Sequence, residues 1–414
     1  MRVLIVGAGP AGLTLALCLA RRGVRADIIE RAPRLNTGGY VVSLQANGWD
    51  VADRLGLLAD VRACALPAAD SVYRDGATGR ELFRYKAQVV AELTGGKMLH
   101  VPRDVLVARL AEALAATGHP GPRFGCTVTA LAQAGEDAQV CLGDGTSTAY
   151  DLVVGADGMH SQVRTLAFGP EAQFCRPLGY RGAAWRMPFD GRLDPPYEGY
   201  MEVGRQVILY QSGPRELSTL LCWRCDDLAP VPARDRHRVV LDAYAGTWPV
   251  LRQIIDGAVD WESAYLDALG QIEMPRWWDG RTVLMGDAAW GLSFLSGQGA
   301  SMAMAGAYLL AQALRTAGMG GGSAIPSGAL AQALAAWEAG LRPTLTRVQQ
   351  QARAMARSYV PRSSAGLWLN RRLLPLLMSR PLLKLRARHL VAPSLIAPAD
   401  LDGGRPPVAH SGRG

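Results

Sequence analysis

Three glycines near the start of the chain have the spacing of a phosphate-binding turn. They are Gly7, Gly9 and Gly12, in the pattern GxGxxG, and a carboxylate, Glu30, follows eighteen residues after Gly12. The first glycine permits a tight turn, the second lets backbone approach a pyrophosphate, and the third lets a helix pack closely on a strand. A carboxylate at this distance binds ribose hydroxyls and repels a 2′-phosphate. The pattern predicts binding of FAD or NAD and does not separate the two.

A strand, a helix and a second strand must hold this turn. Residues 2–6 are an apolar run before the glycines, and an apolar helical pattern follows them and ends at Gly23. Residues 24–29 (VRADII) are expected to form a second strand that leads into Glu30. This order is a βαβ unit of the usual size. The start of its helix offers unpaired N–H groups and a favourable field to a phosphate.

Later segments suggest that the chain is organised discontinuously. Apolar strands that lead into glycine-containing turns recur at 151–158 and 281–289, and alternating segments within 180–225 predict antiparallel strands between them. We expect a helical stretch at about 232–270 and further helices at 329–358 and 364–390. Because the alternating segments lie between the strand-and-turn segments, we expect the domain that they form to be inserted into the domain that carries the glycine turns.

Two of these segments resemble known signatures and decide between FAD and NAD. DLVVGADGMHSQVR (151–164) and RTVLMGDAAWGLSFLSGQGASMAMAGAYLLAQAL (281–314) resemble the second and third signatures of FAD-dependent monooxygenases of the para-hydroxybenzoate hydroxylase type. The resemblance covers residues 1 to about 320, with matching order and spacing. It implies an α/β fold: a Rossmann-like FAD-binding domain, an inserted, mainly antiparallel β-sheet substrate domain, and C-terminal helices.

The resemblance also implies domain boundaries. We expect residues 1–70, 97–178 and 275–325 in the FAD-binding domain, 71–96 and 179–274 in the substrate-binding domain, 326–400 in a C-terminal helical region, and 401–414 in a disordered tail.

The resemblance implies roles for several residues. Asp157 is expected near the FAD pyrophosphate and the transient nicotinamide site, and Asp287 at the ribityl side of the flavin. Arg103 stands where the family has an arginine near the pyrophosphate. His160, two residues after Gly158 in the second signature, is expected to be structural. The expected cofactor contacts are Gly7, Gly9, Ala11, Gly12, Glu30, Arg31, Arg103, Asp157, Gly158, Asp287, Gly297, Gln298, Gly299 and Ala300.

In the family that the chain resembles, the cofactor performs the hard step. NADPH or NADH reduces FAD, O2 adds at flavin C4a, and the hydroperoxide delivers one oxygen atom to the substrate. No protein nucleophile is needed, so no catalytic residue is assigned. The chain has a single GxGxxG, which indicates that the reductant docks transiently. A flavin-dependent dehydrogenase or oxidase, a non-redox FAD-containing cyclase and a regulatory nucleotide-binding protein remain as alternatives.

Substrate contacts are expected from the segment 180–225, where it faces the flavin. The polar and aromatic candidates are Arg181, Trp185, Tyr200 and Tyr210, and Trp290 is assigned equally to packing and to substrate contact. The ten tryptophans favour a bulky hydrophobic substrate, aromatic or polycyclic and similar to a natural product of secondary metabolism, such as an antibiotic precursor.

Four positions depart from the family's pattern. Trp290 replaces its common His, Phe294 replaces a Pro of the flavin-facing loop, and Ser301 and Gly306 replace its usual Asn and Asp. These positions lie where flavin and substrate should meet, so they leave FAD binding intact and the type of substrate open.

Positive charge is concentrated late in the chain. The formal net charge is +8, and residues 341–414 contain thirteen Arg or Lys and two Asp. No nucleic-acid motif accompanies this charge, so we expect no nucleic-acid partner. The amphipathic, basic stretch 366–395 suits either a membrane surface or packing on the core or a partner subunit. Pro375 and Pro381 would break a continuous interfacial helix and favour packing.

The remaining features indicate a cytoplasmic protein. Seven irregularly spaced cysteines suit reduced thiols better than disulfides. The pair Cys222 and Cys225 has CxxC spacing without a second pair or a nearby His, so we expect no metal site. An early glycine breaks the N-terminal apolar run, which argues against a signal peptide, and no apolar stretch is long enough to span a bilayer. We expect a monomer or a homodimer.

Overall fold

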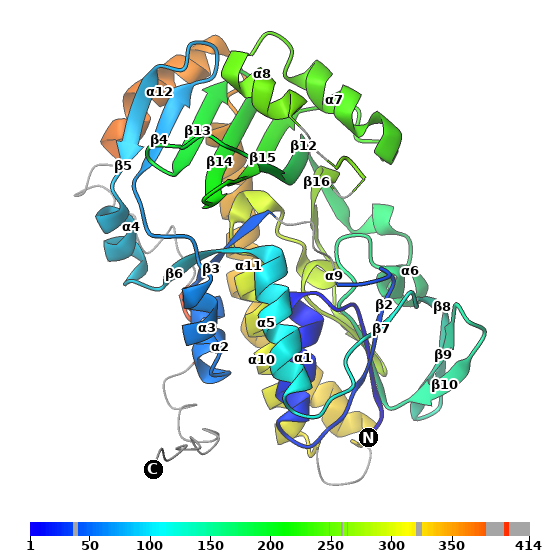
Figure 1. Cartoon of the computed structure of the whole chain (residues 1–414). Helices are drawn as coiled ribbons and strands as arrows, with labels where there is room; N and C mark the ends of the chain where they lie inside the picture. Colours follow the sequence, from blue (N-terminus) through cyan, green and yellow to red (C-terminus); the bar gives the residue numbers. More distant parts are fainter. Residues whose placement is uncertain are drawn as a thin grey trace, which may run out of the picture.

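The computed structural model describes residues 1–35, 40–247, 249–257, 260–262, 264–319, 325–377 and 393–396. It contains two large sheets, one mainly parallel and one mainly antiparallel, with helices packed against each (Figure 1). The predicted mixed α/β fold class is confirmed.

The mainly parallel sheet carries the glycine turn. Its strand order is β17-β18-β11-β1-β2-β7, and every neighbouring pair runs parallel except β17 and β18. β1 lies in the middle and is buried along its whole length, which explains its unbroken apolar sequence. The strands are β1 (Val3–Val6), β2 (Asp27–Glu30), β7 (Arg123–Phe124), β11 (Leu152–Gly155), β17 (Trp278–Asp279) and β18 (Thr282–Leu284). The predicted βαβ unit is confirmed, and the carboxyl ends of β1, β11 and β18 lie together.

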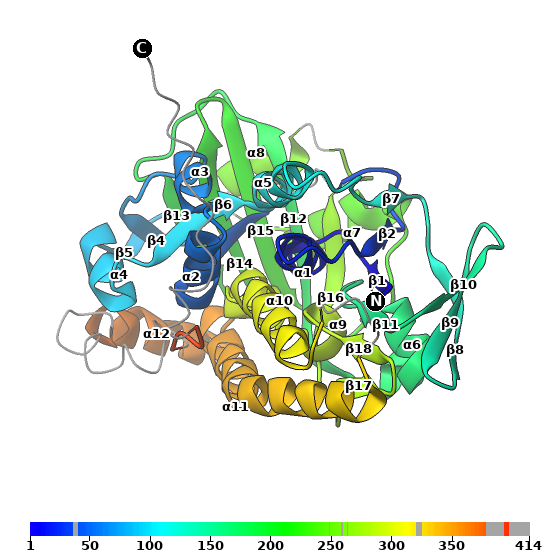
Figure 2. The same ribbon diagram turned by 90° about the horizontal axis from the view of Figure 1, so that it is seen from below.

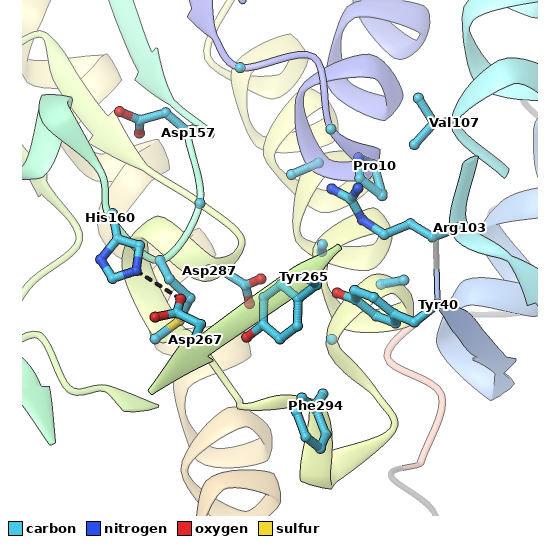
Figure 3. A pocket seen from close by; sticks show the side chains of 18 of the residues that line it. Pro10, Tyr40, Arg103, Val107, Asp157, His160, Tyr265, Asp267, Asp287 and Phe294 are labelled. Carbon is cyan, nitrogen blue, oxygen red and sulfur yellow. Dashed lines mark hydrogen bonds and ion pairs between the residues drawn. The ribbon is translucent and has the colours of Figure 1, made fainter. Parts of the chain in front are cut away.

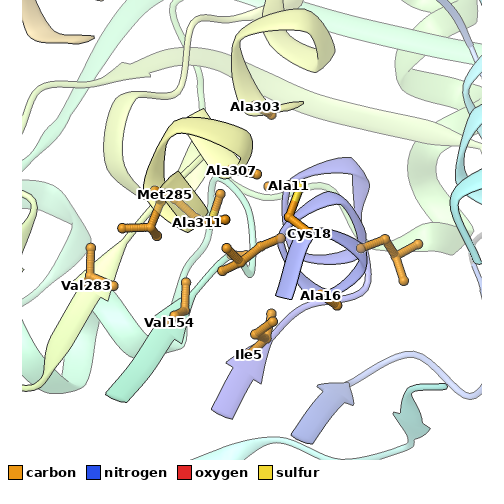
Figure 4. Packing of buried hydrophobic residues seen from close by; sticks show 14 of the residues in the cluster. Ile5, Ala11, Ala16, Cys18, Val154, Val283, Met285, Ala303, Ala307 and Ala311 are labelled. Carbon is orange, nitrogen blue, oxygen red and sulfur yellow. The ribbon is translucent and has the colours of Figure 1, made fainter. Parts of the chain in front are cut away.

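Small side chains let two helices pack closely beside this sheet. α1 (Pro10–Ala20) and α10 (Gly299–Thr316) contact each other, and α5 (Arg103–Ala115) lies on the other side of α1. Figure 4 shows Ala11 of α1 opposite Ala303 and Ala307 of α10, above the apolar residues of β1, β11 and β18. The approach of α1 and α10 brings the two helix N-termini to the same end of the sheet.

The mainly antiparallel sheet has seven strands in the order β16-β12-β15-β14-β13-β4-β5. β4 is paired in parallel with β13, so an early segment joins strands more than one hundred residues later. The helices α7 (Arg236–Ala243) and α8 (Pro249–Asp256) cover one face of this sheet (Figure 1). The strands are β4 (Ser71–Asp75), β5 (Glu81–Tyr85), β12 (Cys175–Pro188), β13 (Tyr197–Glu202), β14 (Arg205–Gly213), β15 (Glu216–Arg224) and β16 (Tyr265–Ile272).

The helical stretch expected at 232–270 is only partly correct. α7 and α8 are helices, but residues 265–272 form β16, an edge strand of the seven-stranded sheet. Its sequence YLDALGQI has apolar residues at mixed spacings, and pairing with β12 decides in favour of the strand. This correction matters because β16 faces the site described below.

Smaller elements connect the two sheets. The antiparallel pair β3 (Val41–Gln45) and β6 (Met98–Pro102) forms a separate two-stranded sheet, and α2 (Ala46–Arg54) and α5 follow these strands. A three-stranded meander lies at the edge of the parallel sheet. The remaining elements are α3 (Leu58–Ala63), α4 (Ala87–Thr94), β8 (Val128–Ala134), β9 (Asp137–Leu142), β10 (Ser147–Tyr150), α6 (Gln162–Phe168), α9 (Asp287–Trp290), and the short 3-10 turns Glu171–Gln173, Ala233–Asp235 and Phe294–Ser296.

Two helices close the described part of the chain. α11 (Ser327–Tyr359) runs beneath α10 and leads to α12 (Ser364–Leu377), which lies against β5 (Figure 2). The helix expected over 364–390 is confirmed to residue 377, and the rest of it, with the expected tail 401–414, lies outside the described residues. Among the helices described, none is both long enough and apolar enough to cross a lipid bilayer.

The division of the chain into two domains stays a prediction. Segments 3–30, 123–155 and 278–284 supply the parallel sheet and the meander, while segments 71–85 and 175–272 supply the strands of the seven-stranded sheet.

Candidate functional site

A cavity of about 780 Å³ lies between the two sheets. Its wall contains the turn after β1, the start of α5, the turn after β11, the turn after β18, the start of α10, and β3 and β16. Segments far apart in the sequence therefore meet around one space (Figure 3). In open α/β sheets, ligands bind outside the carboxyl ends of the strands, which is where this cavity lies.

The glycine turn leaves room for a ligand at one position. A Cβ atom on Gly7, whose φ is +110°, would lie 2.4 Å from the carbonyl oxygen of Ala156, and one on Gly12 would lie 2.0 Å from the carbonyl oxygen of Gly7. A Cβ atom on Gly9 would meet only the guanidinium of Arg103, at 3.8 Å. Packing thus requires Gly7 and Gly12, whereas Gly9 keeps a space open above the N-terminus of α1. That space suits a pyrophosphate.

Arg103 supplies a cation to the same space. It is the first residue of α5, and within the described residues its guanidinium makes no hydrogen bond or ion pair. The neighbouring Asp104 accepts a hydrogen bond from the guanidinium of Arg186 on β12, at 2.6 Å, which ties the start of α5 to the seven-stranded sheet. Arg103 is therefore held in place while its charge remains available to a ligand.

Glu30 ends β2 at the far end of the cavity from the seven-stranded sheet. One carboxylate oxygen accepts the backbone N–H of Ala8 at 2.9 Å, and the other accepts the backbone N–H of Ala32 at 2.9 Å. These bonds fix the orientation of the carboxylate, and each oxygen keeps lone-pair capacity for a hydroxyl group. The geometry suits the ribose of an adenosine, and Arg31 lines the cavity beside it.

Asp157 holds the turn after β11. Its carboxylate accepts the hydroxyl of Ser161 at 2.5 Å and the backbone N–H groups of Gln162 and Val163 at 2.7 and 3.1 Å. Burial raises the pKa of this carboxyl group, against the effect of these donors. The side chain caps α6 and orients the turn, in which Gly158 has a φ of +82°. Both residues line the cavity.

A buried arginine joins this turn to the one after β18. Arg164 donates to the carbonyl oxygen of Ala288 at 3.0 Å, to the carbonyl oxygen of Met159 at 2.6 Å and to the carboxylate of Glu171 at 2.6 Å. The two segments that carry Asp157 and Asp287 are therefore fixed relative to each other by one side chain.

Asp287 begins the short helix α9 and lines the cavity. Its depth in the molecule raises the pKa of the carboxyl group by desolvation, and the Arg103 guanidinium and the Leu292 backbone N–H partly oppose this effect. A carboxylate in such a place needs hydroxyl or amide donors, which a flavin side chain offers.

The start of α10 also opens on the cavity. Gly299 would have no atom within 4 Å of an added Cβ, and Gly297 has a φ of +62°. Gly297, Gly299 and Ala300 line the cavity, while Gln298 is buried behind them. Just before them, Ser293 has a φ of +65°, a conformation that a proline ring does not permit.

The structure brings most of the expected cofactor contacts together. Twelve of the fourteen line the cavity, and Gly12 and Gln298 support it from behind. The expected substrate contacts are placed differently, because only Tyr210 lines the cavity.

Arg181, Trp185, Tyr200 and Trp290 do not line the cavity, and a role for them in substrate binding stays a prediction. Successive residues of a strand point to opposite faces. Trp185 and Tyr200 point to the face covered by α7 and α8, and Arg181 donates to the carbonyl oxygens of Asp227 and Ala229. Trp290 is 2% exposed and packs in the core against other tryptophans.

Three aromatic residues that sequence reasoning did not select as substrate contacts lie in the cavity instead. The ring centroids of Tyr40 and Tyr265 are 5.7 Å apart, and those of Tyr265 and Phe294 are 6.4 Å apart. Figure 3 shows Tyr265 between Asp287 and Tyr40, with Phe294 beside them. Burial raises the pKa of both tyrosines, so both are neutral phenols at ordinary pH.

His160 lies on the cavity wall between two carboxylates. Its Nδ1 is 2.9 Å from Glu171 and its Nε2 is 2.8 Å from Asp267 on β16. The hydrogen bond with Asp267 is the largest of the effects that raise the pKa of His160 to about 9. A protonated His160 therefore joins the turn after β11 to the strand that carries Tyr265.

Comparison with known proteins gives a consistent result. A family described as FAD binding domain matches residues 1–171. The chain is 32% identical over 328 residues to an uncharacterized protein of Mycobacterium tuberculosis, and the match covers 76% of this chain and 85% of that protein. It is 31% identical to a 2-heptyl-3-hydroxy-4(1H)-quinolone synthase of Mycobacteroides abscessus, covering 83% and 87%. It is 28% identical to the flavin-dependent monooxygenase eupH of Phoma sp, covering 88% and 89%.

Solved structures show the same fold. The Klebsiella pneumoniae protein HpxO, in a complex with FAD and uric acid, matches 95% of this chain and 98% of its own with a TM-score of 0.78. Its sequence identity is 22%, so this match bears on the fold.

Proposed function

We propose, from the premise that the chain belongs to the FAD-dependent monooxygenases, that it uses NADPH or NADH and O2 to hydroxylate or epoxidise a bulky, hydrophobic, aromatic or polycyclic substrate. One observation carries the proposal. A single cavity has a cradle suited to a dinucleotide at one end and a group of aromatic side chains at the other.

The dinucleotide end would hold FAD. Gly9 and the N-terminus of α1 would receive the pyrophosphate, with the Arg103 cation beside it, and Glu30 would accept ribose hydroxyls. Asp287 would accept hydroxyl groups of the flavin side chain. The remaining proposed contacts are Gly7, Ala11, Gly12, Arg31, Asp157, Gly158, Gly297, Gln298, Gly299 and Ala300.

The other end would hold the substrate. Tyr40, Tyr210, Leu220, Tyr265 and Phe294 line it, and they come from the start of β3, from the inner face of the seven-stranded sheet and from the loop before α10. Aromatic rings favour stacked or edge-on contacts with flat ring systems. A quinolone, which the name of one similar protein contains, and uric acid, which is bound in the HpxO structure, are such ring systems.

FAD, when bound, supplies the redox and oxygen chemistry. The protein's residues bind it, orient the substrate and exclude water. Tyr40, Tyr265 and Phe294 surround the reacting region with apolar surface, which protects reactive oxygen species from water. The neutral hydroxyls of Tyr40 and Tyr265 face the cavity and can donate a hydrogen bond to a polar group of the substrate.

Anaerobic titration of the purified protein with NADPH and with NADH tests the proposal. We expect a bound flavin whose visible absorption is bleached by at least one of them and returns when air is admitted. With candidate aromatic substrates under 18O2, we expect one labelled oxygen atom in the product.

Other outcomes would point to the alternatives. Return of the flavin colour with stoichiometric H2O2 and an unlabelled, dehydrogenated product would indicate an oxidase or dehydrogenase. A substrate converted without flavin reduction would indicate a non-redox cyclase. Failure to bind FAD would contradict the proposed use of the cavity as a whole.

A further inference from the structure

The helix α12 exposes apolar side chains to solvent. Trp368, Leu369 and Leu373 are 58%, 47% and 41% exposed, whereas Leu367 is buried against Phe83 and Met201 of the seven-stranded sheet. Single exposed apolar residues are normal on protein surfaces. These three differ because they lie within two turns of one helix and none shares the side of Leu367. Leu369 and Leu373 are four residues apart and lie together on the opposite side, and Trp368 lies on the flank between that side and Leu367. We call them the apolar face of α12.

α12 is anchored to the body of the protein, so its apolar face has a fixed direction. Arg371 forms an ion pair with Asp75 of β4, and Leu367 packs between strands β5 and β13. Figure 1 shows α12 at the outer edge of the seven-stranded sheet, beside β4 and β5, and no residue of α12 lines the cavity. The exposed side chains therefore contribute neither to the core nor to the proposed FAD site.

A cation lies directly beside this face. Arg372 lies over the ring of Trp368, with its guanidinium carbon 5.5 Å from the ring centroid. Between Glu338 and Asp400 the sequence contains eleven arginines and lysines and no acidic residue. An apolar helix face with a tryptophan, in a strongly basic stretch of sequence, is the pattern of a helix that lies in the interface of an anionic membrane.

We propose that the apolar face of α12 binds the surface of an anionic lipid membrane, with Trp368, Leu369 and Leu373 inserted among the headgroups and nearby arginines on lipid phosphates. Tryptophan prefers this interface because one side of its ring is apolar and its N–H is polar. The sequence pattern alone favours packing of the leucines on the core. At Leu367 the structure has that packing, but at Leu369 and Leu373 the side chains remain exposed.

A second copy of the chain fits this face less well. In a two-fold dimer an interface meets itself, so Arg372 and the neighbouring cations would face the same cations of the other copy. A lipid surface supplies negative charge over a wide area and has no such repulsion. The inference is independent of the proposed reaction, since α12 does not line the cavity.

Vesicle flotation tests the proposal with the full chain and bound FAD. We expect the protein to float with vesicles that contain phosphatidylglycerol at about 30% and not with phosphatidylcholine alone. Raising the salt concentration should weaken this binding because it screens the arginines. The triple variant Trp368→Ser, Leu369→Ser, Leu373→Ser keeps every cation, and we expect its partitioning to fall by at least about tenfold.

A matched control separates this face from exposed apolar residues in general. Val203 and Phe124 are 42% and 36% exposed and lie on other elements, so the variant Val203→Ser, Phe124→Ser should bind vesicles like the wild type. Both variants should keep the FAD content and visible spectrum of the wild type.

Three results would overturn the proposal. The first is that the wild type does not bind anionic vesicles. The second is that the triple variant binds them as well as the wild type. The third is that neither protein binds vesicles and light scattering shows a dimeric wild type and a monomeric triple variant. The last result would assign the face to a subunit contact.

Discussion

Trp290 occupies the space that a side chain at residue 306 would need. A Cβ atom on Gly306 would lie 2.7 Å from Cη2 of the Trp290 indole. The indole also packs against Trp277 and Trp337, with ring centroids 4.8 and 5.9 Å away. Two departures from the family's sequence pattern, at 290 and 306, are therefore one change in packing between α9, which begins with Asp287, and α10.

Substitution of both residues should lower the free energy of unfolding by less than the sum of the two single substitutions. Gly306→Asp forces a carboxylate against the indole, and Trp290→His leaves a cavity, so each should lower the free energy of unfolding by about 2–4 kcal/mol. In the double variant the smaller ring makes room for the carboxylate. We expect its loss to be smaller than the sum of the two by at least about 1 kcal/mol. Urea unfolding of the four proteins measures this coupling, and strictly additive losses would contradict it.

The sequence is sufficient to predict those parts of the candidate site in which residues act through the backbone. Gly7 and Gly12 act through close contacts with backbone, and Asp157 acts as a helix cap. Such requirements leave fixed spacings in a sequence. The fold class follows from the same segments, because each one pairs an apolar strand with a glycine-containing turn.

The aromatic end of the cavity, which we propose holds the substrate, could not be found in this way. Trp185 and Tyr210 are equally good candidates as residue types, and only the face of the strand separates them. One signal is present, because Trp185 alternates with Ala183 and Met187, which also face α7 and α8. Tyr40 and Tyr265 depend on tertiary pairing: β16 has mixed spacing, and β3 is placed by β6.

Two glycine variants should separate FAD binding from folding. Gly9→Val fits the backbone, whose φ is −81°, and fills only the open space beside Arg103. We expect a folded protein that binds FAD at least about tenfold more weakly. Gly12→Ala places a methyl group against the Gly7 carbonyl oxygen and should destabilise the fold by about 1–3 kcal/mol. FAD fluorescence titration and thermal unfolding make the comparison. If Gly9→Val and the wild type bind FAD with equal affinity, the proposal that the pyrophosphate occupies the space beside Gly9 is wrong.

Variants at Tyr265 and Trp185 should separate the two faces of the seven-stranded sheet. Tyr265→Ala removes an aromatic ring from the cavity, and we expect the KM for an aromatic substrate to rise about tenfold while FAD remains bound. Trp185→Ala empties part of the cluster under α7 and α8, and we expect a loss of about 3–5 kcal/mol in unfolding free energy with KM nearly unchanged. Steady-state kinetics and urea unfolding measure both. The assignment of the faces is wrong if the two variants exchange these effects.

The ion pairs of His160 should make the stability of the protein depend on pH. The pKa of His160 is about 9 in the folded protein, above the ordinary value of about 6.5. A raised pKa means that protonation favours the folded state, so this contribution is complete below about pH 6.5 and disappears as the pH rises through about 9. His160→Gln keeps a polar side chain without the charge. We expect the wild type to melt at a higher temperature than this variant at pH 6, and the difference to vanish above about pH 9.

Asp267→Asn supplies the control, because the Asp267 carboxylate is the main cause of the shift. When His160→Gln is introduced into the Asp267→Asn protein, we expect its effect on the melting temperature to change less between about pH 6 and pH 9 than it does in the wild type. Arg164 and Glu171 remain in place in both backgrounds, so the bond from Arg164 to the Ala288 carbonyl oxygen is preserved. A melting difference in the wild-type background that stays constant from about pH 6 to pH 10 would show that His160 does not join the turn after β11 to β16 through its charge.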